Sequence, residues 1–186
     1  MSKPSNCVWL ITGKPGIGKT TCLSRIIYRI KSDGYTVGGV MTRELRVQGE
    51  RTGFELIDIR TGENGILSST TFDAGPKLGR YRINLQFLSK VGSKSLLSSN
   101  QLSNLTICDE IGPMEMFSPD FRCAIDYIIN SGKPVLGGIH QRLNDPLIQQ
   151  IRSPKFVKIY EVTLQNREEI PNILANEILK LLESKN

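Results

Sequence analysis

Residues 13–20 combine glycines, two lysines and a threonine in a spacing that suits phosphate binding: Gly13, Lys14, Pro15, Gly16, Ile17, Gly18, Lys19 and Thr20. Glycines allow the backbone to turn tightly, so that successive N–H groups point inward at phosphate oxygens. The helical pattern that follows adds the positive end of a helix dipole. In this P-loop pattern Lys19 reaches the β- and γ-phosphates and the Thr20 hydroxyl coordinates Mg²⁺. The sequence therefore predicts a site for a nucleoside triphosphate with Mg²⁺.

A pair of acids, Asp109 and Glu110, follows the apolar run at residues 105–108. A buried parallel strand delivers the residues at its carboxyl end to the ligand crevice of the sheet. We expect Asp109 to hold Mg²⁺ through its water shell. We expect Glu110 to orient or deprotonate the water that attacks the γ-phosphate. Together with Lys19, these acids predict a site for phosphoryl transfer.

The apolar patterns predict the elements that must position these residues. Helical spacing follows the loop as far as Asp33-Gly34, recurs between Ser118-Pro119 and Gly132, and returns at residues 170–182. Apolar runs predict strands at residues 8–11, 36–42, 105–108, 135–139 and 156–162. This alternation predicts an α/β fold, a P-loop three-layer sandwich with a mostly parallel sheet and helices on both faces.

Residues 45–67 break the alternation. Two glycine-centred turns, at residues 48–50 and 61–65, flank the run at residues 54–59, which predicts an antiparallel β-meander. We interpret the meander as an insertion after the second parallel strand. Residues 68–79 have the composition of a mobile loop, residues 84–90 predict a short helix, and residues 93–103 form another polar stretch.

Length and composition exclude several classes of protein. At 186 residues and 39% hydrophobic residues, the chain fits one domain, residues 1–186. A single histidine, His140, and the lack of a Cys-x-x-Cys pair argue against a zinc site. Four cysteines fall mostly in apolar patterns, as buried thiols of a reducing compartment do: Cys7, Cys22, Cys108 and Cys123. With no long apolar stretch, and no signal-peptide pattern after Met1-Ser2-Lys3-Pro4, we expect a cytoplasmic protein without a membrane partner.

The net charge of +6 suits an anionic substrate or a nucleic acid. Basic residues concentrate loosely in the middle third of the chain: Arg43, Arg46, Arg51, Arg60, Lys77, Arg80, Arg82, Lys90 and Lys94. A solvated basic face explains this pattern as well as a binding surface does. A nucleoside triphosphate is therefore the expected partner, and a nucleic acid remains an open one.

The run Asp109-Glu110-Ile111-Gly112-Pro113-Met114-Glu115, followed by Phe117-Ser118 and Phe121, closely resembles the THEP1-type nucleoside-triphosphatases. The resemblance runs the length of the chain. Residues 13–21 match that family's G-x-P-G-x-G-K-T-T, and residues 42–46 match T-x-E-V-R with leucine for valine. Gly53-Phe54 and Asp58 resemble its next strand, Gly79-Arg80-Tyr81 its G-x-Y motif, and Thr163, Asn166 and Arg167 its T-x-x-N-R motif. His140 lies outside these motifs.

The resemblance implies a RecA-like core and slow, Mg²⁺-dependent hydrolysis of ATP, GTP, CTP, UTP and TTP to the diphosphate and phosphate. It also implies nucleotide contacts from the P-loop together with Thr21, and from the segment with Cys108, Asp109, Glu110, Ile111 and Gly112. Arg46 is either a substrate-facing cation or a surface residue, and Arg167 is a candidate for a contact to the nucleobase. Asn166 fits a helix N-cap, since Glu169 follows three residues later. Met114 and Glu115 either pack the turn or hold Glu110.

Two other functions share the P-loop. A nucleotide or small-molecule kinase needs an acceptor site and usually a basic lid, and no arginine-rich lid helix follows His140. A nucleic-acid-associated ATPase driven by a partner would use the basic middle third, and its binding would weaken steeply with salt. Hydrolysis with water as the acceptor is the function that the sequence favours.

Overall fold

A nine-stranded sheet organises the computed structural model, which describes residues 7–153 and 156–185. Its order is β5-β6-β4-β3-β2-β7-β8-β1-β9. Five neighbouring strands are parallel: β2 (Val37–Val47), β7 (Leu105–Ile111), β8 (Val135–Ile139), β1 (Val8–Thr12) and β9 (Val157–Glu161). Four more extend the sheet in antiparallel pairing: β3 (Glu50–Asp58), β4 (Asn64–Ser69), β5 (Lys77–Leu78) and β6 (Tyr81–Ile83).

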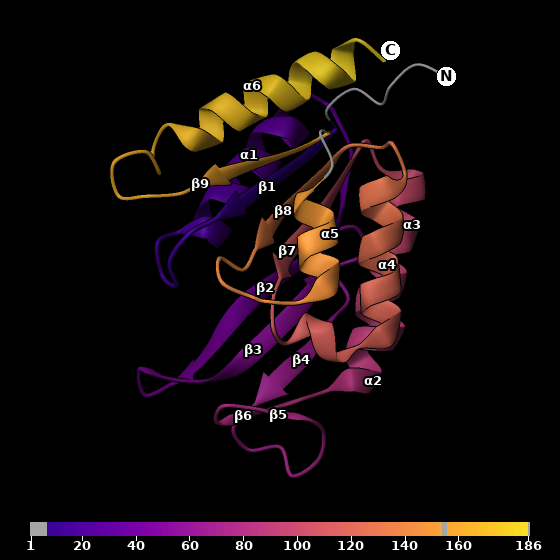
Figure 1. Ribbon diagram of the computed structural model, residues 1–186. Helices are drawn as coiled ribbons and strands as arrows, with labels where there is room; N and C mark the ends of the chain where they lie inside the picture. The colour runs from indigo at the N-terminus through magenta and orange to yellow at the C-terminus, as the bar shows by residue number, and fades with distance from the viewer. Residues whose placement is uncertain (1–6, 154–155, 186) are drawn as a thin grey trace.

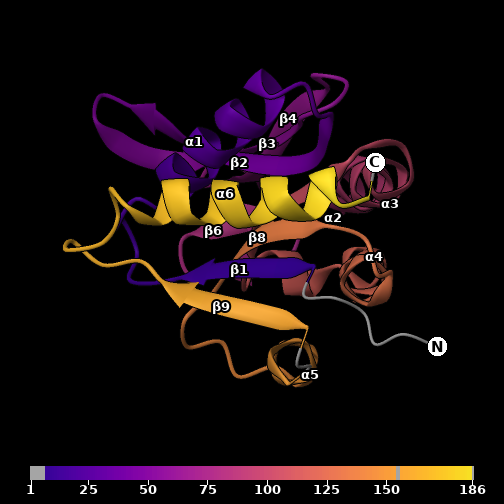
Figure 2. The ribbon, with the colours of Figure 1, turned by 90° about the horizontal axis from the view of Figure 1, so that it is seen from above.

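Helices cover both faces of the parallel strands (Figure 1). Helices α1 (Lys19–Ser32) and α6 (Ile170–Glu183) bury apolar residues on one face, with Leu105, Ile107 and Leu136 of the sheet. Helices α4 (Pro119–Asn130) and α5 (Pro146–Arg152) bury theirs on the other, with Val135 and Ile139. Strands β1 and β9 lie side by side in the view from above (Figure 2). The predicted α/β sandwich with a parallel core is confirmed.

The antiparallel meander is also confirmed, but its bounds differ from those predicted. Strand β2 does not end at Thr42; it continues to Val47 and pairs with β3 from Val40 onward. Only residues 37–40 of β2 pair with β7, so the later residues leave the parallel core while β3 still satisfies their backbone groups. The mixed charges of Arg43 and Glu44 obscured this continuation, because a strand exposed on both faces shows no apolar alternation.

The polar stretch at residues 93–103 contains a helix, and the helix predicted at residues 84–90 does not end at Lys90. Helices α2 (Leu85–Phe87) and α3 (Lys94–Leu102) are joined by a π-helical segment, Leu88–Ser93. Ser95 and Ser99 of α3 are buried because they bond the backbone of Gly39 in β2: the Ser95 hydroxyl donates to its carbonyl (3.0 Å) and the Ser99 hydroxyl accepts from its N–H (2.7 Å). A search for apolar periodicity misses a helix whose inner face is made of serines.

Two further predictions needed correction, and one helix was not predicted. Residues 146–152 form α5, which follows the N-cap Asp145 and was not predicted. Residues 68–79 are not all loop, because β4 extends to Ser69 and β5 begins at Lys77. Asn166 does not cap α6, whose N-cap is Glu169. The Asn166 side chain instead accepts a hydrogen bond from the Thr163 N–H (2.8 Å) and donates one to the Glu161 carbonyl (2.9 Å). A turn between β9 and α6 uses the side-chain groups that the cap would have used.

The thiols follow the prediction in part. Cys7, Cys22 and Cys108 are buried and unbridged, whereas Cys123 on α4 is exposed. Within the described residues, no helix is both long and apolar enough to cross a bilayer. The segment Met1-Ser2-Lys3-Pro4 lies outside the described residues.

Candidate active site

The P-loop connects the carboxyl end of β1 to the first turn of α1. Gly13 and Gly18 have φ angles of 145° and 108°, in the region that side chains rarely adopt. A side chain at Gly13 would also place its Cβ 2.7 Å from the carbonyl oxygen of Val162. The Lys19 ammonium donates to the Gly13 carbonyl over 3.2 Å, so the lysine folds back over the loop. Backbone N–H groups and one cation are thus collected where α1 begins.

The two acids at the end of β7 differ in their surroundings. Asp109 is 1% exposed, and burial raises its pKa from 3.8 to about 7. The charge of Glu110 adds to this rise, whereas a hydrogen bond with the Thr20 side chain and the charge of Lys19 oppose it. Within residues 7–153 and 156–185, Asp109 Oδ2 is buried without a hydrogen-bond partner. A buried carboxylate oxygen beside a threonine hydroxyl fits a bound cation.

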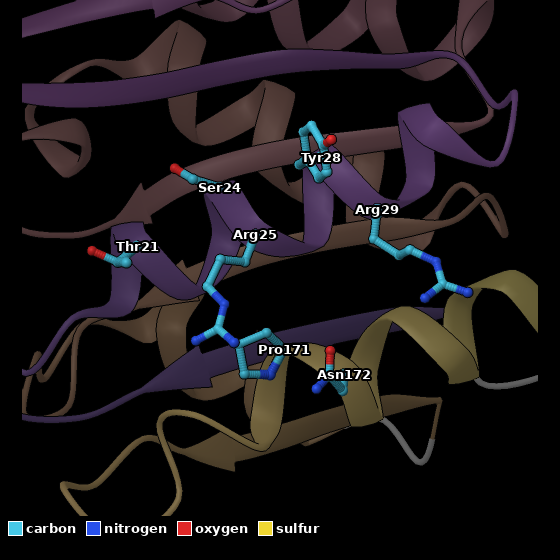
Figure 3. Close-up of a pocket in the computed structure, with 7 residues that line it drawn as sticks. All are labelled: Thr21, Ser24, Arg25, Tyr28, Arg29, Pro171 and Asn172. Carbon is cyan, nitrogen blue, oxygen red and sulfur yellow. The ribbon is translucent and has the colours of Figure 1, made fainter.

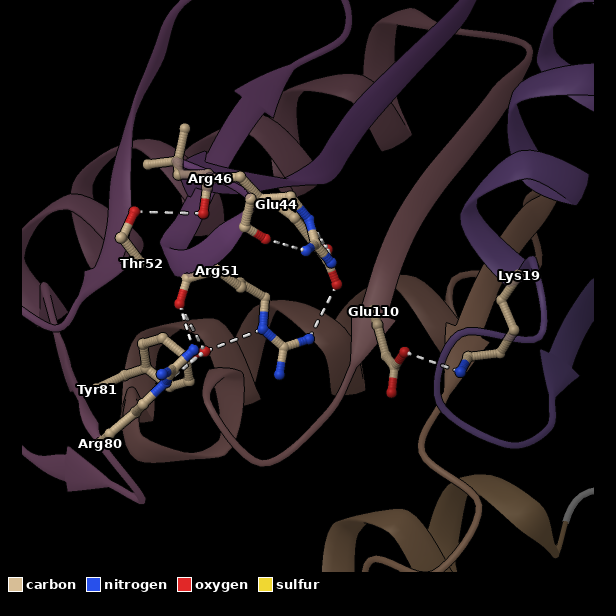
Figure 4. A network of polar contacts seen from close by, with 10 residues as sticks. Lys19, Glu44, Arg46, Arg51, Thr52, Arg80, Tyr81 and Glu110 are labelled. Atoms are coloured by element: carbon tan, nitrogen blue, oxygen red, sulfur yellow. Dashed lines mark hydrogen bonds and ion pairs between the residues drawn. The ribbon is translucent and has the colours of Figure 1, made fainter.

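Glu110 turns toward the lysine. Its Oε2 lies 3.5 Å from the Lys19 Nζ, and its side chain is 25% exposed, so that water reaches it (Figure 4). Glu115 lies close behind: its Oε2 is 3.0 Å from the place that a Cβ on Gly112 would take. Burial raises the pKa of Glu115 to about 8, and the charges of Glu110 and Asp109 add to the rise. At neutral pH Glu115 is therefore largely protonated.

Strand β8 brings the P-loop and the two acids close together, because it lies between β1 and β7 in the sheet. The Thr12 hydroxyl at the end of β1 donates to the Ile139 carbonyl at the end of β8 (2.9 Å). The His140 N–H donates to the Ile111 carbonyl of β7 (3.0 Å). The predicted residues 13–20 and 108–112 therefore meet at one edge of the sheet. The side chains of Cys108 and Ile111 point into the core against α4, which leaves only their backbone groups for a ligand.

The comparisons with known proteins agree with this geometry. A family model described as NTPase matches residues 8–175. The nucleoside-triphosphatase THEP1 of Thermofilum pendens is 41% identical over 175 residues, which cover 94% of this chain and 96% of that protein. The THEP1 protein of Methanosarcina acetivorans is 37% identical over 92% of this chain and 97% of its own length. The chain belongs to the THEP1 nucleoside-triphosphatase family.

Solved structures agree with the family. The crystal structure of THEP1 from Aquifex aeolicus superimposes with a TM-score of 0.80, at 33% identity, over 94% of this chain and 98% of that one. The solution structure of a human cancer-related nucleoside triphosphatase gives a TM-score of 0.76, at 31% identity, over 96% and 98% of the two chains. The resemblance of the chain to THEP1-type proteins is confirmed.

The THEP1 motif around Arg46 forms a network on the β2–β3 hairpin (Figure 4). Arg46 bonds the Glu44 carboxylate (2.6 Å) and the Gly49 carbonyl (2.8 Å). Arg51 bonds the other Glu44 oxygen (2.9 Å) and the Tyr81 hydroxyl (2.9 Å). The G-x-Y motif therefore fastens the edge of the meander to the hairpin. The guanidinium contacts of Arg46 stay within the hairpin and do not reach the P-loop.

The T-x-x-N-R motif lies beside α1. The Arg167 carbonyl accepts a hydrogen bond from the Cys22 thiol (3.5 Å), and Arg25 pairs with Glu168 (2.7 Å). A groove of about 410 Å³ runs from this point between α1 and α6 (Figure 3). Its lining begins at Thr21, directly after the P-loop, and continues over Arg25 and Tyr28 toward Arg29. Pro171 and Asn172 of α6 form its other side.

Sequence reasoning missed the residues that shape the site without touching it. Gly138 on β8 leaves room beside the acids: a Cβ there would lie 3.4 Å from Asp109 Oδ1 and 3.5 Å from Glu110 Cβ. Outside the site, the ion pair between Glu44 and Arg51 also passed unnoticed, because its partners are on different strands. The glycine pair in an otherwise apolar strand was the available signal for Gly138, since a strand glycine often marks a close approach.

Proposed function

We propose that this protein hydrolyses nucleoside triphosphates to the diphosphate and phosphate, with Mg²⁺ as cofactor and water as the acceptor. The observation that carries the proposal is the meeting of Lys19, Asp109 and Glu110 at the ends of β1 and β7. One cation, one buried carboxylate and one solvent-accessible carboxylate are the groups that hydrolysis of a triphosphate requires. The relatives from Thermofilum pendens and Methanosarcina acetivorans are nucleoside-triphosphatases, which supports the same reaction.

The loop N–H groups and Lys19 hold the β- and γ-phosphates in this proposal. Lys19 leaves the Gly13 carbonyl and the Glu110 carboxylate, its partners in the free protein, and turns to phosphate oxygens. Its departure frees Glu110 to accept the proton of the attacking water. Thr20 and Asp109 hold Mg²⁺, which neutralises charge on the phosphate oxygens when bound. The orphaned Oδ2 of Asp109 is the atom that this cation, or a water of its shell, would satisfy.

In this proposal the nucleoside lies toward Thr21, which lines the groove between α1 and α6. The Arg25 and Tyr28 side chains of this groove are substantially exposed, and Arg25 is already paired with Glu168. Such a surface offers few fixed donors and acceptors for the edge of a base. We infer a tolerance for different bases, with kcat/KM values for ATP, GTP, CTP and UTP within a thousandfold, which is about 4 kcal/mol.

The two alternatives receive less support. The nucleic-acid hypothesis loses weight because Glu44 and Glu55 pair with three arginines of the basic middle third: Arg43, Arg46 and Arg51. A kinase would need a basic lid after β8. Arg152 of α5 instead donates to the carbonyls of His140 (2.8 Å) and Gln141 (3.2 Å), and so is engaged with the backbone.

Glu110→Gln tests the assignment of the base. The amide keeps the shape but cannot take a proton, so nucleotide binding should survive while kcat falls on the order of a hundredfold or more. Glu115→Gln is the matched control: a protonated Glu115 has no charge to lose at pH 7, so its kcat should stay near that of the parent. Asp109→Asn should raise the Mg²⁺ requirement as well. Rescue of Glu110→Gln by Mg²⁺, or a parental kcat, would show that the water is activated elsewhere.

A further inference from the structure

His140 occupies a position to which the sequence motifs assign no role. It follows β8, and β8 separates the strand of the P-loop from the strand of the acids. Its backbone N–H is bonded to Ile111 of β7, while the preceding residue accepts from Thr12 of β1. The backbone of His140 is therefore fixed between the P-loop and the Asp109-Glu110 pair.

The alternation of β8 places His140 on the P-loop side of the sheet. Val135 and Ile139 belong to the core against α4 and α5, whereas Leu136 belongs to the core against α1 and α6. Gly138 faces the same side as Leu136, since a Cβ there would contact Asp109 Oδ1. With a period of two, His140 follows Gly138 on that side. The Thr20 side chain of α1 is close enough to lower the pKa of Asp109, so this is also the face on which α1 begins.

One ring nitrogen is already committed. Nδ1 accepts a hydrogen bond from the Arg142 N–H (3.3 Å), which assigns the proton of the neutral imidazole to Nε2. Within residues 7–153 and 156–185, Nε2 makes no hydrogen bond, and the residue is half-buried. The ring is thus held by one nitrogen and offers a donor with the other.

We propose that His140 Nε2–H donates a hydrogen bond to the γ-phosphate of the bound triphosphate. This inference rests on the proposed function. The space beside Gly138, between Glu110 and the P-loop, is where the terminal phosphate must lie if Glu110 is to reach the attacking water. A hydrogen-bond donor at the end of β8 would contact the γ-phosphate, which the triphosphate carries and the diphosphate product lacks. His140 therefore distinguishes triphosphate from diphosphate.

The test compares His140→Ala, His140→Gln and the parent by calorimetric titration with ADP and with a non-hydrolysable β,γ-imido analogue of ATP, both with Mg²⁺. His140→Ala should weaken binding of the analogue about tenfold and leave ADP unchanged, the scale of one hydrogen bond to a charged group. Its kcat should fall by at least as much. His140→Gln, which restores a donor, should recover part of both. Gln141→Ala is the control, because that side chain bonds Glu161 (3.0 Å) at the end of β9.

If His140→Ala prefers the ATP analogue over ADP to the same degree as the parent does, the inference is overturned. A parallel loss of ADP binding, or of thermal stability, would overturn it too, because a structural role would then explain the effect. If the parent itself bound no triphosphate or released no phosphate, the proposed function would fail with it. If the parent hydrolyses the triphosphate and His140→Ala binds the analogue as tightly as the parent does, only the role of His140 is refuted.

Discussion

The buried Asp109 makes the free protein less stable than its fold allows. Its pKa rises from 3.8 to about 7 on folding, because burial takes its carboxylate out of water, and the charge of Lys19 offsets only part of this effect. At 1.4 kcal/mol per pKa unit, this corresponds to about 4 kcal/mol of destabilisation above pH 7. Asp109→Asn keeps the shape without the charge. We expect this variant to be more stable than the parent in the absence of nucleotide and Mg²⁺.

The sign of the pH dependence follows from linkage. A carboxyl whose pKa is raised by folding favours the folded state at low pH, and this contribution is lost as the pH rises. The unfolded parent ionises from about pH 4, whereas the folded parent keeps the proton of Asp109 until about pH 7. The advantage of Asp109→Asn should therefore be small at pH 4, grow to about 4 kcal/mol near pH 7, and then remain constant.

Urea unfolding without ligands measures this difference. Trp9, the single tryptophan, is buried and bonded to Glu177 of α6 (3.0 Å), so its fluorescence reports on the packing of β1 against α6. Asp145→Asn is the control of opposite sign, because Arg122 holds the pKa of Asp145 below its usual value (2.7 Å). It should cost about 1 kcal/mol above pH 4. If Asp109→Asn is no more stable than the parent at pH 8, or if its gain in the free energy of unfolding does not grow with pH, burial of the Asp109 carboxylate does not destabilise the fold.

Two further predictions test the loop and the sheet. Lys19→Ala should abolish turnover and greatly weaken triphosphate binding, because the transferred phosphoryl group loses its main point charge; near-normal phosphate release by this variant would remove the P-loop assignment. Gly39→Ala should destabilise the fold by more than about 4 kcal/mol in urea, since its φ is 107° and its Cβ would lie 2.0 Å from the Ile107 carbonyl oxygen of β7. Gly62→Ala, also at positive φ (79°) but with nothing within 4 Å, should cost only about 1 kcal/mol; equal losses at the two glycines would contradict the steric argument.

Local sequence determined the elements whose signals are short-range. The glycines and Lys19 of the P-loop, the apolar run before Asp109 and the Ser118-Pro119 helix start each depend on neighbours in the chain. The Ser118 hydroxyl accepts from the Phe121 N–H (3.2 Å), as a cap should, and β8 has the predicted bounds. These features were readable because backbone conformation and periodic burial leave a pattern within a few residues.

Only the tertiary structure decided what depends on partners far along the chain. Ser95 and Ser99 turn a polar stretch into a helix because they bond Gly39, some sixty residues away in sequence. Arg46 is held by its hairpin, whatever its motif suggests. His140 acquires its place from the strand order, since β8 lies in the sheet between β1, which leads to the P-loop, and β7, which carries the two acids. Burial and strand neighbours are properties of the assembled sheet, and no local pattern of residue types encodes them.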